Sequence, residues 1–411
     1  MRLNKFIGDS FLMILSSGIA QVILIITTPI ITRLYSPAEF GEFTIFSNIA
    51  MILIPIINAR YDLLIVNAKN DRSANILSQI SFLISLLILL ILIPILAISA
   101  WLYPNFILDF IFIIMLFLVS LTNIFTNYLN KERKYKVLSL INVFRAGSMA
   151  LLQIIFGLLS LGSLGLIIGF SLSYITGITL GYKTFKKHFN IVRNKEETKA
   201  LFLENKNQLV YSTPSILLNS LSFSVVVFFI GILYTNTEVG IYGMAIRVLG
   251  IPVTIISLGL SKIFMQQAND YYIERGNFRN LLLKFSSTLV IVSIILYVPL
   301  YLFSEELVNI LLGHSWVDAI TVIKIVIPLF VIRLIVSTVS LSVIVLQKQQ
   351  LELILQALFL IGTTVTFVIS KMLNLTFLNF VSINTAVLIV SYMIFFIALY
   401  YFAKNKQFKN S

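Results

Sequence analysis

The chain has 411 residues, of which 58% are hydrophobic and only 11% charged, and its net charge is +13. A mean hydropathy of +0.98 excludes a soluble globular domain. Because cysteine is absent, disulfides, thiolate metal sites and cysteine nucleophiles are excluded as well. A chain that crosses a bilayer needs helices of about 20 apolar residues or a closed barrel. The apolar runs are too long for barrel strands, so the sequence predicts an all-α polytopic membrane protein.

Twelve apolar spans follow one another along the chain. The first half contains six, over residues 6–31, 40–59, 75–100, 107–129, 137–160 and 164–182. The second half contains six more, over residues 209–234, 239–263, 285–303, 317–346, 351–370 and 376–402. This division predicts an N-terminal six-helix lobe (1–186), a cytoplasmic inter-lobe loop (187–208) and a C-terminal six-helix lobe (209–411).

A short motif supports the division because it occurs twice, 199 residues apart. The first copy lies in T-R-L-Y-S-P-A-E-F-G-E-F (32–43), and the second is L-Y-T-N-T-E-V-G-I-Y (233–242). The two copies share identical residues at Leu34/Leu233, Tyr35/Tyr234, Glu39/Glu238 and Gly41/Gly240. Each copy follows one long apolar run and opens the next, which indicates two parallel structural repeats.

Basic residues are divided unevenly between the two sides of the predicted membrane. With the N-terminus inside, the cytoplasmic segments and Lys262 hold 24 of the 30 basic residues, and the opposite loops hold two, Arg33 and Lys371. Short cytoplasmic loops retain Lys and Arg, so both termini are predicted to be cytoplasmic. The positive charge then lies near anionic lipid headgroups, and no nucleic acid is expected as a partner.

Patterns of catalytic and metal-binding residues are missing from the sequence. The chain contains two histidines, His188 and His314, and neither has a predicted partner. Neither an H-E-x-x-H motif nor a G-x-x-x-x-G-K-[ST] phosphate loop occurs. We therefore expect no metal, no cofactor and no catalytic residue, and we expect a transporter rather than an enzyme.

Four basic residues lie inside predicted spans: Arg145, Arg247, Lys324 and Arg333. Each costs about 2.5–3.5 kcal/mol at the centre of a membrane. Arg333 is more than about 18 Å from either end of its span, and the other three are about 10–13 Å from their nearer interface. No Asp or Glu lies deep in any span, so this excess of positive charge predicts an anionic ligand. Lys324 is nine residues from Arg333, which places it on the opposite face and leaves its role open.

Three motifs carry a resemblance to a known family. They are the 32–43 motif, A-R-Y-D-L-L-I-V (59–66) and L-L-G-H-S-W-V-D-A (311–319). The chain resembles the bacterial polysaccharide repeat-unit flippases, the Wzx-type members of the multidrug/oligosaccharidyl-lipid/polysaccharide exporter superfamily. The resemblance covers the whole chain in length, span number and two-lobed repeat. The third motif is degenerate, because many relatives have phenylalanine and acidic residues where Leu312, His314 and Ser315 stand here.

The resemblance implies a V-shaped, alternating-access transporter in the bacterial inner membrane. Its substrate would be an undecaprenyl-diphosphate-linked oligosaccharide, moved from the inner to the outer leaflet for O-antigen or capsule assembly. The diphosphate suits the buried cations, so we assign Arg333, Arg145 and Arg247 to substrate binding, Arg60 and Arg33 to gates, and Lys324 as a further candidate. A monomer is expected, with a polysaccharide polymerase and a chain-length regulator as candidate partners.

Two other functions stay open at this point. A cation-coupled multidrug exporter shares the architecture, although cationic drugs would favour deep acidic residues rather than basic ones. An integral-membrane glycan polymerase is the other alternative, but no predicted outer loop exceeds about 15 residues, which is small for holding acceptor sugars. The sequence leaves the sugars and the coupling ion undetermined.

Overall fold

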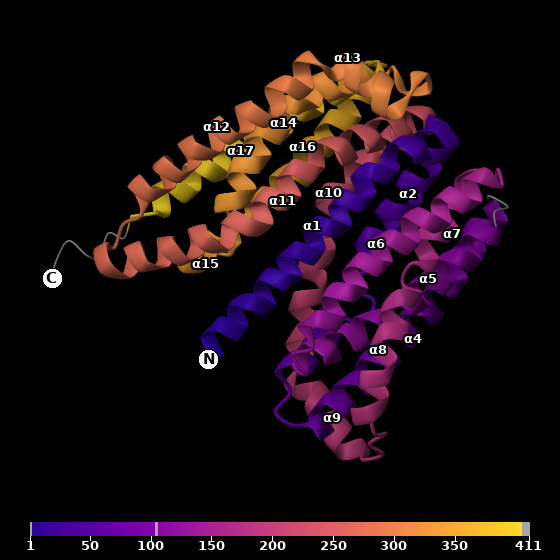
Figure 1. Cartoon of the computed structure of the whole chain (residues 1–411), viewed down its shortest axis with the longest axis vertical. Helices are drawn as coiled ribbons and strands as arrows, with labels where there is room; N and C mark the ends of the chain where they lie inside the picture. The colour runs from indigo at the N-terminus through magenta and orange to yellow at the C-terminus, as the bar shows by residue number, and fades with distance from the viewer. Residues whose placement is uncertain (1, 103–105, 405–411) are drawn as a thin grey trace. The chain divides into compact units, whose positions relative to one another are not determined.

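A computed structural model describes residues 2–102 and 106–404 of the chain (Figure 1). Apart from an isolated bridge between Asn277 and Lys404, the regular structure of these residues is helical. Eleven of the helical segments are long and apolar enough to cross a membrane, which confirms the predicted all-α polytopic fold. The two chain ends that were predicted to be cytoplasmic, residue 1 and residues 405–411, lie outside the described residues.

The second predicted span, 40–59, is the one that differs from the expectation. Its helix α2 (Pro37–Leu53) has 17 residues and ends just before Pro55. Residues 54–60 continue as turns, and Ala59 and Arg60 have positive φ angles of 44° and 62°. A 17-residue helix rises about 26 Å, slightly less than the hydrocarbon core of a bilayer. The turn residues therefore extend this span.

Contacts divide the chain into two compact units, and unit 1 consists of Met1–Tyr35 and Ile45–Ser224. Within it α1 packs along α6, and α5 packs between α4 and α8 (Figure 1). The glycines of α6 and α7 permit this close packing: a Cβ on Gly157 would lie 2.9 Å from the Tyr35 ring, and one on Gly169 would lie 2.7 Å from Gln153. Unit 1 also contains the second half of α2 and the first half of α10 (Thr213–Leu233). Its complete helices are α1 (Arg2–Leu34), α3 (Tyr61–Leu64), α4 (Asp71–Leu102), α5 (Phe106–Lys131), α6 (Tyr135–Leu158), α7 (Ser163–Leu172), α8 (Ile175–His188) and α9 (Lys195–Glu204).

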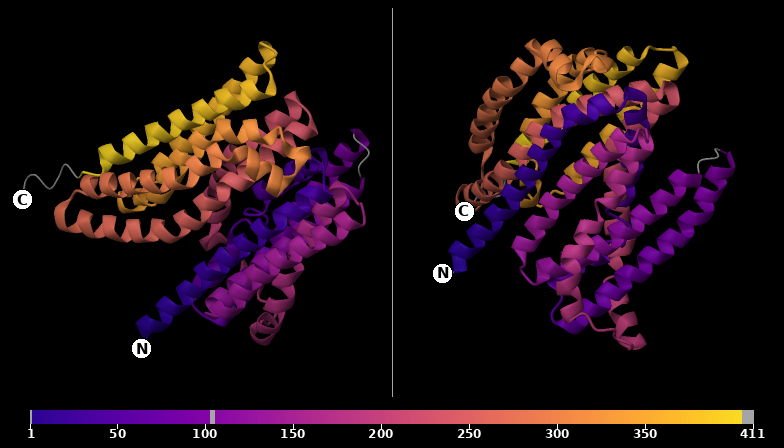
Figure 2. Two further views of the ribbon diagram at one scale, coloured as in Figure 1. Left: turned by 45° about the horizontal axis from the view of Figure 1, so that its top comes forward. Right: turned by 45° about the vertical axis from the view of Figure 1, so that its right-hand side comes forward.

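Unit 2 consists of Ser36–Thr44 and Val225–Ser411. Its centre is α14, which packs against α11, α12 and α17, and α16 and α17 form an antiparallel hairpin (Figure 2). The lobe boundaries predicted from the repeat remain a prediction, since these units are defined by contacts alone. Besides the first half of α2 and the second half of α10, the helices of unit 2 are α11 (Asn236–Arg275), α12 (Arg279–Leu302), α13 (Ser304–Leu307), α14 (Ala319–Val339), α15 (Ser342–Val345), α16 (Gln350–Met372) and α17 (Phe377–Phe402).

The repeated motif forms equivalent helix starts in its two copies. In the first, the Ser36 amide and hydroxyl donate to Glu39 Oε2 at 2.7 and 2.9 Å. In the second, the Thr235 amide and hydroxyl donate to Glu238 Oε2 at the same two distances. These are capping boxes, which satisfy backbone donors at a helix start. The helix cap therefore explains why both copies of the motif have a glutamate at this position, Glu39 in one and Glu238 in the other.

The two copies also touch each other through their shared glycines, inside unit 2. A Cβ added to Gly41 would lie 1.8 Å from the carbonyl oxygen of Asn236, and one added to Gly240 would lie 1.8 Å from that of Pro37. Pro37 and Asn236 are themselves 199 residues apart, so the contact is reciprocal. Residues that contact each other in this reciprocal way are related by a two-fold axis. Only glycine fits at either position, which explains why both copies keep it.

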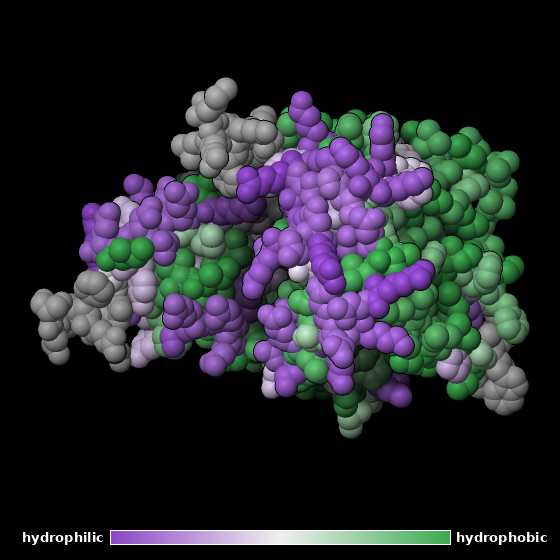
Figure 3. Space-filling view, turned by 90° about the horizontal axis from the view of Figure 1, so that it is seen from below, coloured by the Kyte–Doolittle hydropathy of each residue, from purple (hydrophilic) through white to green (hydrophobic). Residues whose placement is uncertain are grey.

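Hydrophobic and hydrophilic side chains occupy different parts of the surface. Seen from below the view of Figure 1, hydrophilic side chains gather on the face toward the viewer, while hydrophobic side chains cover much of the flank beside it (Figure 3). Large exposed side chains such as Ile91, Leu151, Ile295 and Ile397 would be unfavourable in water. This division is expected for helices whose flanks face lipid and whose ends face water.

Candidate functional site

Arg247 of α11 is held against aromatic residues of unit 2. Its guanidinium lies over the ring of Phe40, 5.8 Å from the centroid. Phe40 is itself buried and meets Trp316 edge to face, with ring centroids 5.6 Å apart. Nη2 of Arg247 is buried and has no hydrogen-bond partner within the described part of the chain. A guanidinium group held in this way can still donate a hydrogen bond to an anion.

Arg333 of α14 lies among aromatic side chains in the same unit. It is half-buried, with its guanidinium 5.4 Å from the centroid of Phe330. It also interacts electrostatically with the hydroxyls of three buried tyrosines, Tyr242, Tyr297 and Tyr392. Lys324, earlier on α14, contacts a different ring: its Nζ lies 5.9 Å from the centroid of Tyr301.

The three cations predicted in unit 1 have different surroundings. Arg145 of α6 is exposed, and its guanidinium lies 4.9 Å from the centroid of Tyr174. Arg33 is also exposed, and its Nη1 donates to the Pro29 carbonyl of its own helix at 2.7 Å. Arg60 is half-buried and caps α3 in a left-handed conformation, with a buried Nε that has no partner among the described residues.

Arg60 lies near a buried carboxylate that the sequence did not single out. Asp62 is only 7% exposed and is the one charged residue among the buried side chains of the described chain. Its Oδ2 accepts from Asn127 Nδ2 at 2.9 Å. Burial raises the pKa of the Asp62 carboxyl to about 6, although Arg60 and Asn127 favour the ionised form. Asp62 can therefore change its charge near neutral pH.

A chain of polar side chains extends from Asp62 along one face of α5. Asn127 also donates to the carbonyl of Asn123 at 3.0 Å, and Asn123 donates to Asn58 Oδ1 at 3.2 Å. Asn58 in turn donates to Ser120 Oγ at 2.8 Å. The i, i+3 and i+7 spacing of Ser120, Asn123 and Asn127 on an apolar helix was the sequence signal that could have predicted this cluster.

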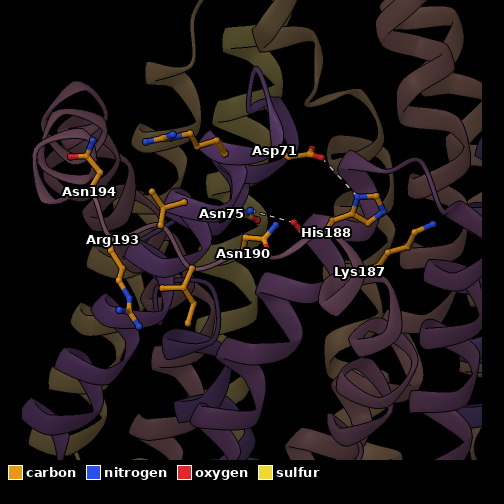
Figure 4. Close-up of a pocket in the computed structure, with 10 residues that line it drawn as sticks. Asp71, Asn75, Lys187, His188, Asn190, Arg193 and Asn194 are labelled. Atoms are coloured by element: carbon orange, nitrogen blue, oxygen red, sulfur yellow. Dashed lines mark hydrogen bonds and ion pairs between the residues drawn. The ribbon is translucent and has the colours of Figure 1, made fainter.

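A pocket of about 670 Å³ lies at the end of unit 1 where α4 begins and α8 ends (Figure 4). His188 Nδ1 lies 3.8 Å from Asp71 Oδ2, and its Nε2 lies 3.9 Å from Glu132 Oε2. The expectation that His188 has no partner was therefore wrong, because its two acidic neighbours come from distant parts of the sequence. Within the described ranges no group of three or more acidic, histidine or cysteine residues could hold a metal ion.

One ion pair beside this pocket attaches the segment after α8 to the rest of unit 1, and another joins α4 to α5. Arg72 Nη2 and Glu197 Oε2 are 2.6 Å apart, and Lys131 pairs with Asp71. The predicted loop 187–208 contains α9, whose Phe202 stacks on Tyr61 with centroids 5.5 Å apart. Arg72, which lines this pocket, thus helps to hold the connecting segment in place, and the pocket lies outside the set of predicted binding residues.

Comparison with solved structures places this fold among membrane transporters. The lipid II flippase MurJ in an inward closed conformation has a TM-score of 0.73, with 14% identity over 96% of this chain and 87% of that one. An inward-facing multidrug resistance MATE family transporter has a TM-score of 0.66, with 16% identity over 95% and 93%. A transporter of the same superfamily from Pyrococcus furiosus, described by the reverse polarity of its binding pocket, has a TM-score of 0.63, with 15% identity over 96% and 94%.

The sequence itself matches a family model over residues 30–321, which is more than half of the chain. The chain belongs to that family, described as polysaccharide biosynthesis protein. A comparison with curated proteins finds no significant match. Family and fold agree with the resemblance seen in the three motifs, and they define a multi-pass membrane protein of polysaccharide biosynthesis with a flippase-like fold.

Proposed function

We propose that this protein is a flippase for undecaprenyl-diphosphate-linked oligosaccharide repeat units. It moves them from the inner to the outer leaflet of the bacterial inner membrane, where they are assembled into O-antigen or capsule. The observation that carries the proposal is the set of arginines inside apolar spans, in a sequence with no acidic residue deep in any span. A diphosphate supplies the negative charge that such a set favours.

Each cation has a role that follows from its surroundings. Arg247 and Arg333 both lie over aromatic rings, and the unpartnered Nη2 of Arg247 can donate to a phosphate oxygen. The positive charge of Arg333 attracts the same diphosphate from α14. Arg145 is exposed on α6 over Tyr174, and we assign it to the substrate path as well. Arg33 and Arg60 are proposed as gate residues, and Lys324 as a weaker contact.

The location and partners belong to the same proposal. Both termini lie in the cytoplasm, since basic residues are concentrated in the segments on that side. The protein acts as a monomer that delivers single units to a polysaccharide polymerase and a chain-length regulator. No metal or cofactor takes part, and the membrane potential acting on an anionic substrate is one available driving force.

The test is deletion of the gene in the parent bacterium, followed by extraction of undecaprenyl-linked glycans and assay of their leaflet. Single complete units accumulating on the inner leaflet, with no surface polymer, are the expected result. Units accumulating on the outer leaflet would instead indicate a polymerase, and an unchanged lipid pool would contradict both. Complementation with Arg333→Gln should fail, whereas Arg72→Gln, which removes a cation paired at the end of unit 1, should restore the polymer.

A multidrug exporter is the second candidate, because the fold is shared with a multidrug resistance MATE family transporter. Cationic drugs would favour acidic residues in the spans, and here the deep charges are basic. Drug susceptibility of the same deletion strain separates the two functions. A strain that is hypersensitive to cationic drugs but has normal surface polymer would favour the exporter.

A further inference from the structure

A second pocket lies in unit 2, between the consecutive helices α11 and α12. Only Gly276, Asn277 and Phe278 connect the two helices, and Gly276 closes α11 in a left-handed conformation with φ 60°. Despite this tight connection, α11 packs mainly on α14 and only loosely on α12. The space between them is a pocket of about 700 Å³, within the range of ligand sites.

The connecting turn is fixed by the end of α17, so the closed end of the pocket is well defined. The Phe278 amide donates to the Ala403 carbonyl at 3.0 Å. Arg279 donates through Nε to the Tyr400 carbonyl and through Nη2 to the Tyr401 carbonyl, both at 2.8 Å. Phe278 is 1% exposed. The separation of α11 and α12 is therefore fixed by these hydrogen bonds within unit 2.

The α11 wall changes from apolar to cationic toward the turn. Its lining residues are, in order, Leu260, Gln267, Tyr271 and Arg275. The last three are spaced four residues apart, which places them in a row along one face of the helix. The Arg275 guanidinium lies 4.9 Å from the Tyr271 centroid. This wall therefore offers an apolar surface far from the turn and a fixed cation close to it.

The α12 wall shows the same change in the same direction. Far from the turn it presents Val292, Leu289, Thr288 and Phe285, and close to the turn it presents Lys284 and Asn280 together with Leu281. None of the lining residues is acidic: Asp270 and Glu274 precede Tyr271 and Arg275 in sequence but do not line the pocket. The predicted topology places 264–284 in the cytoplasm, so the cationic end lies at the surface of the inner leaflet and the apolar end lies within it.

We propose that this pocket binds one anionic phospholipid of the inner leaflet. Arg275 and Lys284 neutralise its phosphate, the amides of Gln267 and Asn280 donate to headgroup oxygens, and the start of an acyl chain packs against Leu289. A zwitterionic lipid carries a cation beside its phosphate, so it fits a pocket with two cations and no acid less well. The site needs only a membrane around the protein, so it stands independently of the proposed substrate.

Lipid retention by the purified full-length chain tests this proposal. Phosphatidylglycerol, phosphatidylcholine, a polyprenyl diphosphate and inorganic phosphate are titrated separately, and bound lipid is counted by native mass spectrometry. One phosphatidylglycerol should be retained, with phosphatidylcholine weaker. The Arg275→Ala/Lys284→Ala double variant should raise the half-saturating concentration of phosphatidylglycerol about 30-fold, the effect expected for two surface cations.

Matched variants separate the pocket from general surface charge. Lys199→Ala/Lys206→Ala removes two exposed cations elsewhere and should leave binding unchanged. Thr288→Trp fills the apolar part from an exposed lining position, keeps both cations and should weaken retention as well. Equal loss in the control pair would overturn the proposal, as would full retention in Thr288→Trp. Preference for the polyprenyl diphosphate, or displacement of the lipid by inorganic phosphate, would overturn the assignment to a phospholipid.

Discussion

The two copies of the repeated motif begin alike and then lead to different structures. Both start a helix with a capping box, Ser36 with Glu39 and Thr235 with Glu238. After that, α2 ends at Leu53 in a turn, whereas α11 continues without interruption to Arg275. The helix start and the glycine contact thus explain the residues that the two copies share. The structure beyond the motif differs between the copies because neither of these contacts extends into it.

The two copies differ most at the position of the buried carboxylate, Asp62. The offset of 199 residues relates Asn58 to Ser257 and Asp62 to Ser261. Ser257 shares its hydroxyl with Ser337 at 2.9 Å and Thr338 at 3.0 Å, so the second copy has a small hydroxyl cluster where the first has asparagines and a carboxylate. One repeat therefore carries a titratable group at this place and the other a neutral one.

The largest expected effect comes from the reciprocal glycine contact. Gly41→Ala and Gly240→Ala each place a Cβ 1.8 Å from a backbone oxygen, so each should cost about 3 kcal/mol or more of unfolding free energy. Thermal unfolding in detergent measures both variants. Gly147→Ala is the control, because a Cβ there has nothing within 4 Å. If only one of the two motif glycines tolerates alanine, the contact is not reciprocal.

The buried acid should make the stability of the first copy depend on pH. Burial raises the pKa of Asp62 from 3.8 to about 6, so its contribution is greatest below pH 4 and is lost as the pH rises through 6. Relative to Asp62→Asn, the wild type should lose about 2–3 kcal/mol of unfolding free energy between pH 4 and pH 7, since one pKa unit is equivalent to about 1.36 kcal/mol. Chemical unfolding at several pH values tests this. Ser261→Ala keeps Asp62 and is the control, because the difference in stability between this variant and the wild type should not change with pH. Parallel curves for the wild type and Asp62→Asn would contradict the burial of the charge.

The shared tyrosine should matter more in the first copy than in the second. Tyr35 is 2% exposed and donates to the Gln153 carbonyl at 2.6 Å. Tyr234 is only partly buried and donates to the Leu375 carbonyl at 3.0 Å. We expect Tyr35→Phe to cost about 1–2 kcal/mol and Tyr234→Phe about 0.5–1 kcal/mol of stability. Unfolding curves that rank the two variants in the opposite order would contradict this difference.

The smallest expected effect comes from the helix caps, and it should be equal in the two copies. Ser36→Ala and Thr235→Ala each remove one capping hydroxyl and should each cost about 0.5 kcal/mol of unfolding free energy, the low end of the range for an N-cap. Thr237→Ala, at the exposed second residue of α11, should be nearly neutral. A cost confined to one copy would show that only that helix start depends on its cap.

The fold was predictable because spans of apolar residues report helix length directly, and the helical segments match the predicted spans closely. The early end of α2 was harder to predict from the sequence, since it depends on Pro55 and on two non-glycine residues with positive φ angles. The predicted cations were found by their rarity inside spans, and their substrate contacts stay a prediction. The surroundings of Asp62 and His188 were missed because their partners, Asn127 for one and Glu132 for the other, come from another part of the chain.

The uninterrupted course of α11 has a mechanical consequence. Its 40 residues give a rod about 60 Å long, roughly twice the thickness of the hydrocarbon core. Pro252 stands inside this helix and removes one backbone hydrogen bond there, so a bend is easiest at that point. Arg275 lies 23 residues farther on, about 35 Å away, so each degree of bending displaces it by about 0.6 Å. The helix therefore acts as a lever arm that turns small angular changes at the proline into ångström-scale movements of one wall of the α11–α12 pocket.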